Sequence, residues 1–95
     1  MDLKEARKEI DRIDRQMVEL LRERLGVCDE IAKYKGEHGL PLTDAARERE
    51  KLCEVSELIG EELSSYAVEL YSVIFEICKK RQADYCTGDS KETCI

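Results

Sequence analysis

Two cationic side chains, Arg24 and Lys35, lie on a stretch whose apolar residues recur at steps of three and four. Arg24 occupies a position of that series where an apolar side chain is expected, between Leu20 and Val27. In an α-helix, residues eleven positions apart differ by about 20° around the axis and by ~16 Å along it. Long cationic side chains placed in this way can reach toward one anion of small-metabolite size. The pair therefore predicts an anion-binding site.

A third cation, Arg7, lies on the same stretch but cannot serve that site from the same straight helix. It precedes Arg24 by seventeen residues, which places it ~25 Å away and about 100° around the axis. In an antiparallel pair of such helices, Arg7 of one chain could approach the Arg24 region of the other. The spacing therefore favours a site shared between two chains.

Two later segments carry further polar residues at helical spacing. Asp44, Arg47 and Glu48 stand at i, i+3 and i+4, which is one face of a helix. Cys78 and Gln82 are four residues apart and extend an apolar stripe. With the cations of the first segment they describe a pocket that holds several positive charges, one or two acids and an amide. Such a cationic excess inside a helical bundle is unfavourable unless an anion fills it.

The same residues also have purely structural explanations. Most charged side chains in a helical protein of this composition face solvent, which would account for Arg7, Arg47 and Glu48. A buried arginine more often pairs with a carboxylate than binds a ligand, and Asp14 or Glu48 could pair with Arg24. Asp44 could be a helix cap only, and Gln82 could lie at a fraying helix end.

Three helix-forming segments would position these residues, and they predict an all-α fold. A long N-terminal helix is expected from about residue 2 to 35, followed by a loop that contains two glycines and the only proline. A second helix should begin at a cap formed by Thr43 or Asp44 and end at about Ile59. A third should span about 63–85, and the polar tail 86–95 is expected to be disordered.

The length of the first helix predicts a partner chain. At ~1.5 Å per residue it measures about 50 Å, more than the diameter of a globule of 95 residues, so its apolar seam must extend beyond any monomeric core. On the third helix, Ala67, Leu70, Ile74 and Ile77 are expected to be buried.

Composition narrows the classes of function. The chain is 40% charged with a net charge of −6, which argues against nucleic acid as a partner. No apolar run is long enough to span a membrane and the N-terminus lacks a signal peptide, so we expect a cytoplasmic protein. Five cysteines and one histidine show no metal-ligand spacing. Cys28 and Cys53 are expected to be small buried side chains, and pairing of Cys86 with Cys94 is left open.

Three stretches together resemble the all-helical chorismate mutase family: "ARKEIDRIDRQMVELLRERLGVCDEIAKYK", "LPLTDAARERE" and "LYSVIFEICKKRQ". The resemblance covers about residues 3–85, so one domain is expected over 1–85. It implies an intertwined helical homodimer with two equivalent sites, each borrowing one arginine from the partner. It also implies an isomerase that rearranges chorismate to prephenate in phenylalanine and tyrosine biosynthesis (the shikimate pathway), without metal or cofactor.

The resemblance also implies roles for the substrate-holding residues. Arg7 of the partner chain and Arg24 would hold the two carboxylates of chorismate. Lys35 would contact a carboxylate and the ether oxygen of the breaking bond, and Gln82 would donate to the same oxygen. Such a pericyclic reaction needs a dianion held in its compact conformer and positive charge near the ether oxygen.

The remaining positions would contact the ring. Glu48 and the segment around Asp44 would bind the ring hydroxyl, and Arg47 would line the site. Cys78 stands where family members often have serine, and a thiol is a weaker donor, so it is expected to line the site.

Two other hypotheses assign a different function to the chain. An isochorismate-pyruvate lyase has the same fold and a similar cationic pocket, and release of pyruvate from isochorismate would identify it. A helical dimerisation module without activity would leave the charges on the surface.

Overall fold

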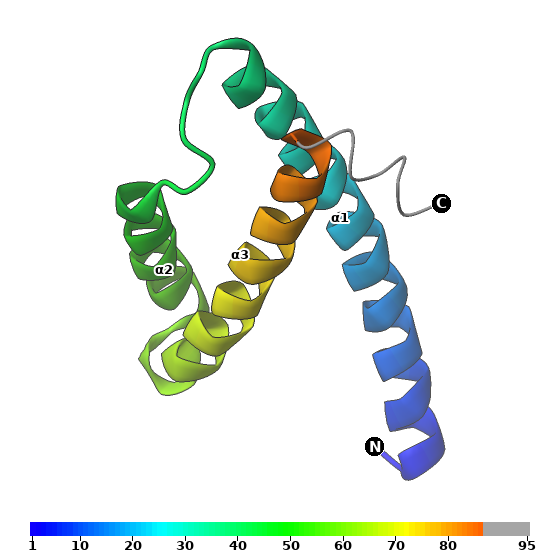
Figure 1. Cartoon of the computed structure of the whole chain (residues 1–95). Coiled ribbons are helices and arrows are strands. Elements are labelled where there is room, and N and C mark those ends of the chain that lie inside the picture. Colours follow the sequence, from blue (N-terminus) through cyan, green and yellow to red (C-terminus); the bar gives the residue numbers. More distant parts are fainter. Residues whose placement is uncertain (87–95) are drawn as a thin grey trace.

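The computed structural model describes residues 1–86 and consists of helices joined by short connections. They are α1 (Leu3–Glu37), α2 (Ala45–Ile59), the short 3₁₀ helix η1 (Glu61–Leu63) and α3 (Ser64–Cys86) (Figure 1). Residues 1–86 contain no strand, so the predicted all-α class with one long and two shorter helices is confirmed. Of the predicted tail 86–95, only Cys86 is described, and it ends α3; the rest, including Cys94, lies outside the described residues.

The bounds of α1 follow from its capping residues. The carboxylate of Asp2 accepts a hydrogen bond from the backbone amide of Glu5 at 2.8 Å, which satisfies one of the free amides of the first turn. The helix contains no proline, and it continues through Gly26, where helix propensity is lowered by only ~1 kcal/mol. It ends before Gly39, whose φ of 63° lies in the left-handed region that favours glycine.

The second helix is capped by Asp44 rather than by Thr43. The Asp44 carboxylate accepts from the backbone amide of Arg47 at 3.0 Å, and Glu48 places negative charge in the first turn, where the helix dipole favours it. Gly60, with a φ of 98°, ends the helix at the predicted place and turns the chain into η1.

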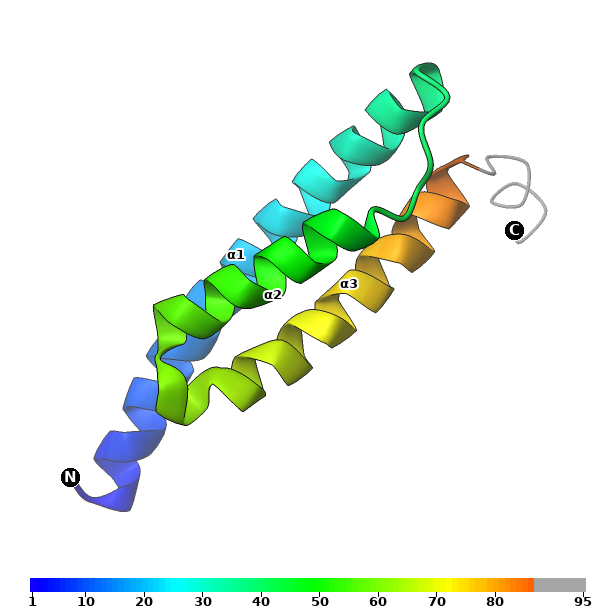
Figure 2. The same cartoon turned by 90° about the vertical axis from the view of Figure 1, so that its left-hand side faces the viewer.

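α3 packs against α1 on one side and against α2 on the other. The hairpin formed by α2 and α3 is antiparallel, and α3 contacts both of the other helices (Figures 1 and 2). Only the C-terminal half of α1 takes part in this packing, and its N-terminal half, drawn in blue, extends past the other helices (Figure 1). An ion pair between Arg81 and Asp29, with Nε donating to Oδ1 at 3.0 Å, ties α3 to α1. The longest dimension of the chain is 52 Å, close to the predicted length of its first helix.

The core of the single chain is thin. Its buried residues are small or medium in size: Cys28, Ala32, Val55, Ala67, Cys78 and Gln82. Along the free half of α1 the apolar seam is open to solvent, with Met17 53% and Leu20 62% exposed. The length of the first helix predicted such a seam, which extends beyond the core of a single chain.

Some burial predictions were wrong. Ala67 is buried as expected and Ile74 is half-buried, but Leu70 and Ile77 are 49% and 38% exposed, because no described element covers that face of α3. Cys28 is buried, whereas Cys53 is exposed on α2.

None of the helices in residues 1–86 has the length and apolar composition needed to cross a bilayer.

Candidate active site

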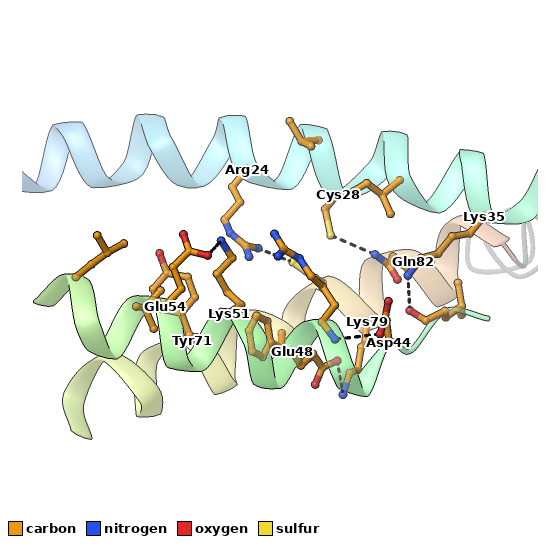
Figure 3. A pocket seen from close by; sticks show the side chains of 18 residues that line it. Arg24, Cys28, Lys35, Asp44, Glu48, Lys51, Glu54, Tyr71, Lys79 and Gln82 are labelled. Carbon is orange, nitrogen blue, oxygen red and sulfur yellow. Dashed lines mark hydrogen bonds and ion pairs between the residues drawn. The ribbon is translucent and has the colours of Figure 1, made fainter. Parts of the chain in front are cut away.

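A cavity of about 570 Å³ lies between the three helices and the loop that precedes α2 (Figure 3). Seven of the eight predicted site residues line this cavity: Arg24, Lys35, Asp44, Arg47, Glu48, Cys78 and Gln82. They come from all three helices and from the cap of α2, so the fold brings together side chains that the sequence keeps up to 58 positions apart. Their chemical roles stay predictions.

Arg7 is the predicted residue that does not line the cavity. It is exposed on the free half of α1, close to the N-terminus. The continuous helix between Arg7 and Arg24 keeps the two guanidinium groups on different turns and different faces. Within residues 1–86 of one chain, the cavity therefore lacks this cation.

Arg24 enters the cavity without a carboxylate partner among the described residues. Its Nη1 donates to the sulfur of Cys78 at 3.3 Å, and its guanidinium carbon lies 5.7 Å from the centre of the Tyr71 ring. Neither neighbour is an anion, and none of the ion pairs within residues 1–86 includes Arg24. Within one chain, neither Asp14 nor Glu48 neutralises Arg24. The positive charge of Arg24 stays available to a ligand.

Lys35 stands at the other end of the cavity, in the last turn of α1 (Figure 3). Its Nζ donates to the backbone carbonyl of Leu42 at 2.8 Å, which fixes the ammonium group against the loop. An ammonium group has three donors. The bond to Leu42 uses one of them, so two can still face a ligand.

Gln82 is the buried polar residue of the site, with 7% of its surface exposed. Its Nε2 donates to the sulfur of Cys28 at 3.6 Å, a long contact to a weak acceptor. The alternative in which Gln82 lies at a fraying helix end is wrong, because the side chain is enclosed between α1 and α3. A stronger acceptor in the cavity could compete with the sulfur for this amide.

Glu48 is paired with a lysine from α3. Lys79 Nζ lies 3.3 Å from a carboxylate oxygen of Glu48 and 3.4 Å from one of Glu76. The hydrogen bond to Glu48 is the main cause that raises the pKa of Lys79. The pair closes the side of the cavity between α2 and α3.

Three charged residues of the cavity were missed from the sequence: Lys51, Glu54 and Lys79. Lys51 lies three residues after Glu48, and its Nζ is 3.0 Å from a carboxylate oxygen of Glu54. The spacing argument that grouped Arg47 with Glu48 would also have included Lys51. In a chain with 40% charged residues, every helical face carries such groups, so spacing alone did not single them out.

The charges of the cavity do not cancel. Five cations line it, namely Arg24, Lys35, Arg47, Lys51 and Lys79, against three carboxylates, Asp44, Glu48 and Glu54. The cavity thus carries an excess of two positive charges in a chain whose net charge is −6. Low-dielectric walls focus such a local field, so the cavity favours a dianion over neutral or cationic ligands.

Comparisons with known proteins point to one family. The sequence model of the family described as chorismate mutase type II matches residues 6–83. The chain is 32% identical over 92 residues to a chorismate mutase of Methanocaldococcus jannaschii, which covers 87% of this chain and 86% of the relative. No solved structure gives a significant match.

Two longer proteins match part of the chain. A bifunctional chorismate mutase/prephenate dehydratase of Aquifex aeolicus is 47% identical over 49 residues, which is 52% of this chain and 14% of the relative. A T-protein of Haemophilus influenzae is 41% identical over 46 residues, which is 48% of this chain and 12% of the relative.

Proposed function

The chain belongs to the type II chorismate mutase family, and on that premise we propose that it catalyses the rearrangement of chorismate to prephenate. The observation that carries the proposal is the excess of two positive charges in a cavity where Arg24 has no carboxylate partner in residues 1–86. Chorismate carries two carboxylates, so its charge matches that excess.

Binding would begin at Arg24. Its contacts with the sulfur of Cys78 and the ring of Tyr71 are weak, so a substrate carboxylate can replace or supplement them with a charge-assisted, bidentate hydrogen bond. The second carboxylate would be held by Arg7 of the partner subunit. Two fixed carboxylates would restrict the flexible substrate to the compact conformer in which the reacting carbons meet.

The reaction itself breaks a carbon–oxygen bond and forms a carbon–carbon bond within one molecule. The ether oxygen gains electron density in the transition state, and donors aimed at it lower the barrier. Lys35 and Gln82 are the donors that we assign to this oxygen. Lys35 keeps two free N–H groups, and Gln82 makes only a long bond to a weak acceptor. No proton has to be transferred.

The ring hydroxyl would be bound on the α2 side of the cavity. Glu48 is the acceptor assigned to it, and Lys79 holds that carboxylate in place from α3. Asp44 and Arg47 would complete this wall. Cys78 would line the pocket next to Arg24 rather than anchor the substrate.

A homodimer would supply the missing arginine. The free half of α1 carries an exposed apolar seam that includes Ile13, Met17 and Leu20, and Arg7 lies on the same half. Burial of that seam against a second copy would remove apolar surface from water. It would also bring the partner subunit's Arg7 toward the cavity, in keeping with the helical spacing of Arg7 and Arg24.

The test is a direct assay of the purified chain with chorismate and, separately, with isochorismate. Formation of prephenate from chorismate is expected. Pyruvate release from isochorismate without prephenate formation would identify the lyase instead. A folded dimer that converts neither substrate would overturn the proposal and favour a module without activity.

A further inference from the structure

Two cysteines from different helices meet in the wall of the cavity. Cys28 on α1 is 6% exposed and Cys78 on α3 is 7% exposed, and both line the cavity. The two thiols face each other between these helices, since each sulfur accepts a hydrogen bond from the helix that carries the other cysteine. The sulfur of Cys28 accepts from Gln82 on α3 (Figure 3). The sulfur of Cys78 accepts from Arg24 on α1. Arg24 and Gln82, two of the residues assigned to substrate binding, therefore donate hydrogen bonds to this pair of thiols.

We propose that Cys28 and Cys78 form an oxidisable dithiol site, which a low-molecular-weight disulfide converts into a covalent bond between α1 and α3. The expected loss of activity after oxidation rests on the proposed function, but formation of the disulfide bond does not. No metal is required. The partner is a small reagent of the oxidised-glutathione class, which can approach through the cavity.

The disulfide forms in two thiol–disulfide exchange steps that conserve atoms and electrons. The thiolate of one cysteine attacks a sulfur of the small disulfide, forms a mixed disulfide and releases one small thiol. The thiolate of the second cysteine then attacks the protein sulfur of that mixed disulfide and releases the second small thiol. The two cysteines lose two electrons and two protons, and the small disulfide gains them.

The position of the two thiols favours the second step. A disulfide needs Cβ atoms about 3.5–4.5 Å apart and sulfur atoms at ~2.05 Å. Two thiols that face each other from packed helices have only a short movement to make. Cys53 lacks such an arrangement, because it is exposed on α2 and does not line the cavity.

Oxidation would change the cavity. The bonded sulfur atoms must lie closer together than two thiols in contact, so each moves toward the other. Cys78 would withdraw from Arg24 Nη1, now 3.3 Å away, and Cys28 from Gln82 Nε2, now 3.6 Å away. The amide and the guanidinium would both lose the neighbour that orients them, and substrate binding would weaken.

The thiol of Cys28 is protected at neutral pH. Burial raises the pKa of Cys28 to about 11, and the contact with Cys78 adds to this effect, while the bond from Gln82 and the charge of Arg24 oppose it. Because the thiolate is the nucleophile, exchange at Cys28 should be slow at neutral pH and faster under mildly alkaline conditions. Brief oxidant exposure would then leave the site reduced.

The simpler explanation is that both cysteines are only small buried side chains, as free cysteines often are. That explanation predicts that the thiols stay free, or carry separate mixed disulfides. The two explanations thus differ in a covalent product that can be measured.

Peptide mapping after oxidation tests the proposal. Trypsin would leave Cys53 and Cys78 on one peptide, because no lysine or arginine lies between Lys51 and Lys79. We would therefore treat the Cys53→Ser chain with oxidised glutathione at neutral and mildly alkaline pH, block the remaining thiols and digest it. The matched control is the same chain with Cys28→Ser, and circular dichroism checks that both stay folded.

The expected product is a peptide pair joined through Cys28 and Cys78, two hydrogen atoms lighter than the separate peptides and formed faster at alkaline pH. The proposal would be overturned if the folded chain kept both thiols free or carried mixed disulfides only. Pairing of either cysteine with Cys86 or Cys94 would overturn it too.

Activity gives a second readout. For the Cys53→Ser chain, the activity of the oxidised form should fall at least about tenfold below that of its reduced form and return with dithiothreitol. In a Cys53→Ser chain that also carries Cys28→Ser and Cys78→Ser, and so has no thiol in the cavity, this ratio should stay near one. A cross-link without loss of activity would overturn the claim that oxidation alters the cavity. An inactive reduced chain would instead contradict the proposed function, and peptide mapping would still decide the dithiol site.

Discussion

The guanidinium of Arg24 is bound by the sulfur of Cys78 at 3.3 Å and by no carboxylate of residues 1–86. A thiol is a weak acceptor, so this contact orients the guanidinium without neutralising it. Arg24 occupies an apolar position of α1 and is partly buried. A half-buried charge of this kind is stabilised when an anionic ligand binds, because the ligand supplies the missing counter-charge.

Replacing Arg24 should therefore reduce kcat/KM strongly. We expect Arg24→Ala to lower it by about a hundredfold or more, since a charge-assisted bond to a carboxylate contributes on the order of 2–3 kcal/mol. Arg24→Lys should retain part of the activity, because it keeps the charge but loses the bidentate geometry. Steady-state kinetics would measure both, and Arg49→Ala is the matched control, since Arg49 is exposed on α2 and lies outside the cavity.

The two variants that lack one arginine each should complement one another. Arg7→Ala and Arg24→Ala chains are each expected to be nearly inactive. In an equal mixture after subunit exchange, half of the dimers are mixed, and each mixed dimer has one site with both arginines. Activity should then recover to about a quarter of the wild-type value. Differently tagged chains would confirm exchange, and continued inactivity of confirmed mixed dimers would contradict the shared site.

Loss of the donors assigned to the ether oxygen should act mainly on kcat. We expect Lys35→Ala to lower kcat by about 10²–10³-fold, the usual effect of removing a donor that stabilises charge in the transition state. Lys33→Ala is the control, because Lys33 is exposed two residues away and does not line the cavity. An effect on KM alone would mean that Lys35 binds the substrate without assisting the bond change.

Two glycines should respond in opposite directions to the same substitution. Gly60→Ala places a Cβ at a φ of 98° and should lower the free energy of unfolding by about 1–3 kcal/mol. Gly26→Ala introduces a Cβ that meets no atom within 4 Å, in the interior of α1. It should raise the free energy of unfolding by about 0.5–1 kcal/mol. Thermal unfolding followed by circular dichroism would measure both. Equal effects would contradict the assignment of Gly60 as the turn between α2 and η1.

Local patterns allowed the helices to be predicted, because caps and periodicity depend on neighbouring residues. Asp44 and Gly60 mark the ends of α2 by their own side-chain or backbone chemistry. Spacing also indicated which faces of α1 and α2 carry the site. It could not indicate that Lys79 from α3 would pair with Glu48, since that contact depends on how the helices cross.

Burial was the least predictable property. Leu70 and Ile77 have the spacing of core residues, yet they are exposed in the single chain, because no described element covers them. Cys53 was expected inside and lies outside. That Cys28 and Cys78 face each other was not expected either, because the two positions are fifty residues apart and only the packing of α3 on α1 brings them together.

The free half of α1 has a consequence for how the protein responds to dilution. A chain with so few buried side chains gains little stability alone, and we expect most of its cooperative unfolding energy to come from contacts with a second copy. Association then enters the unfolding equilibrium by mass action. The midpoint of thermal unfolding should rise with protein concentration, and specific activity should fall once the chain is diluted below its dissociation constant.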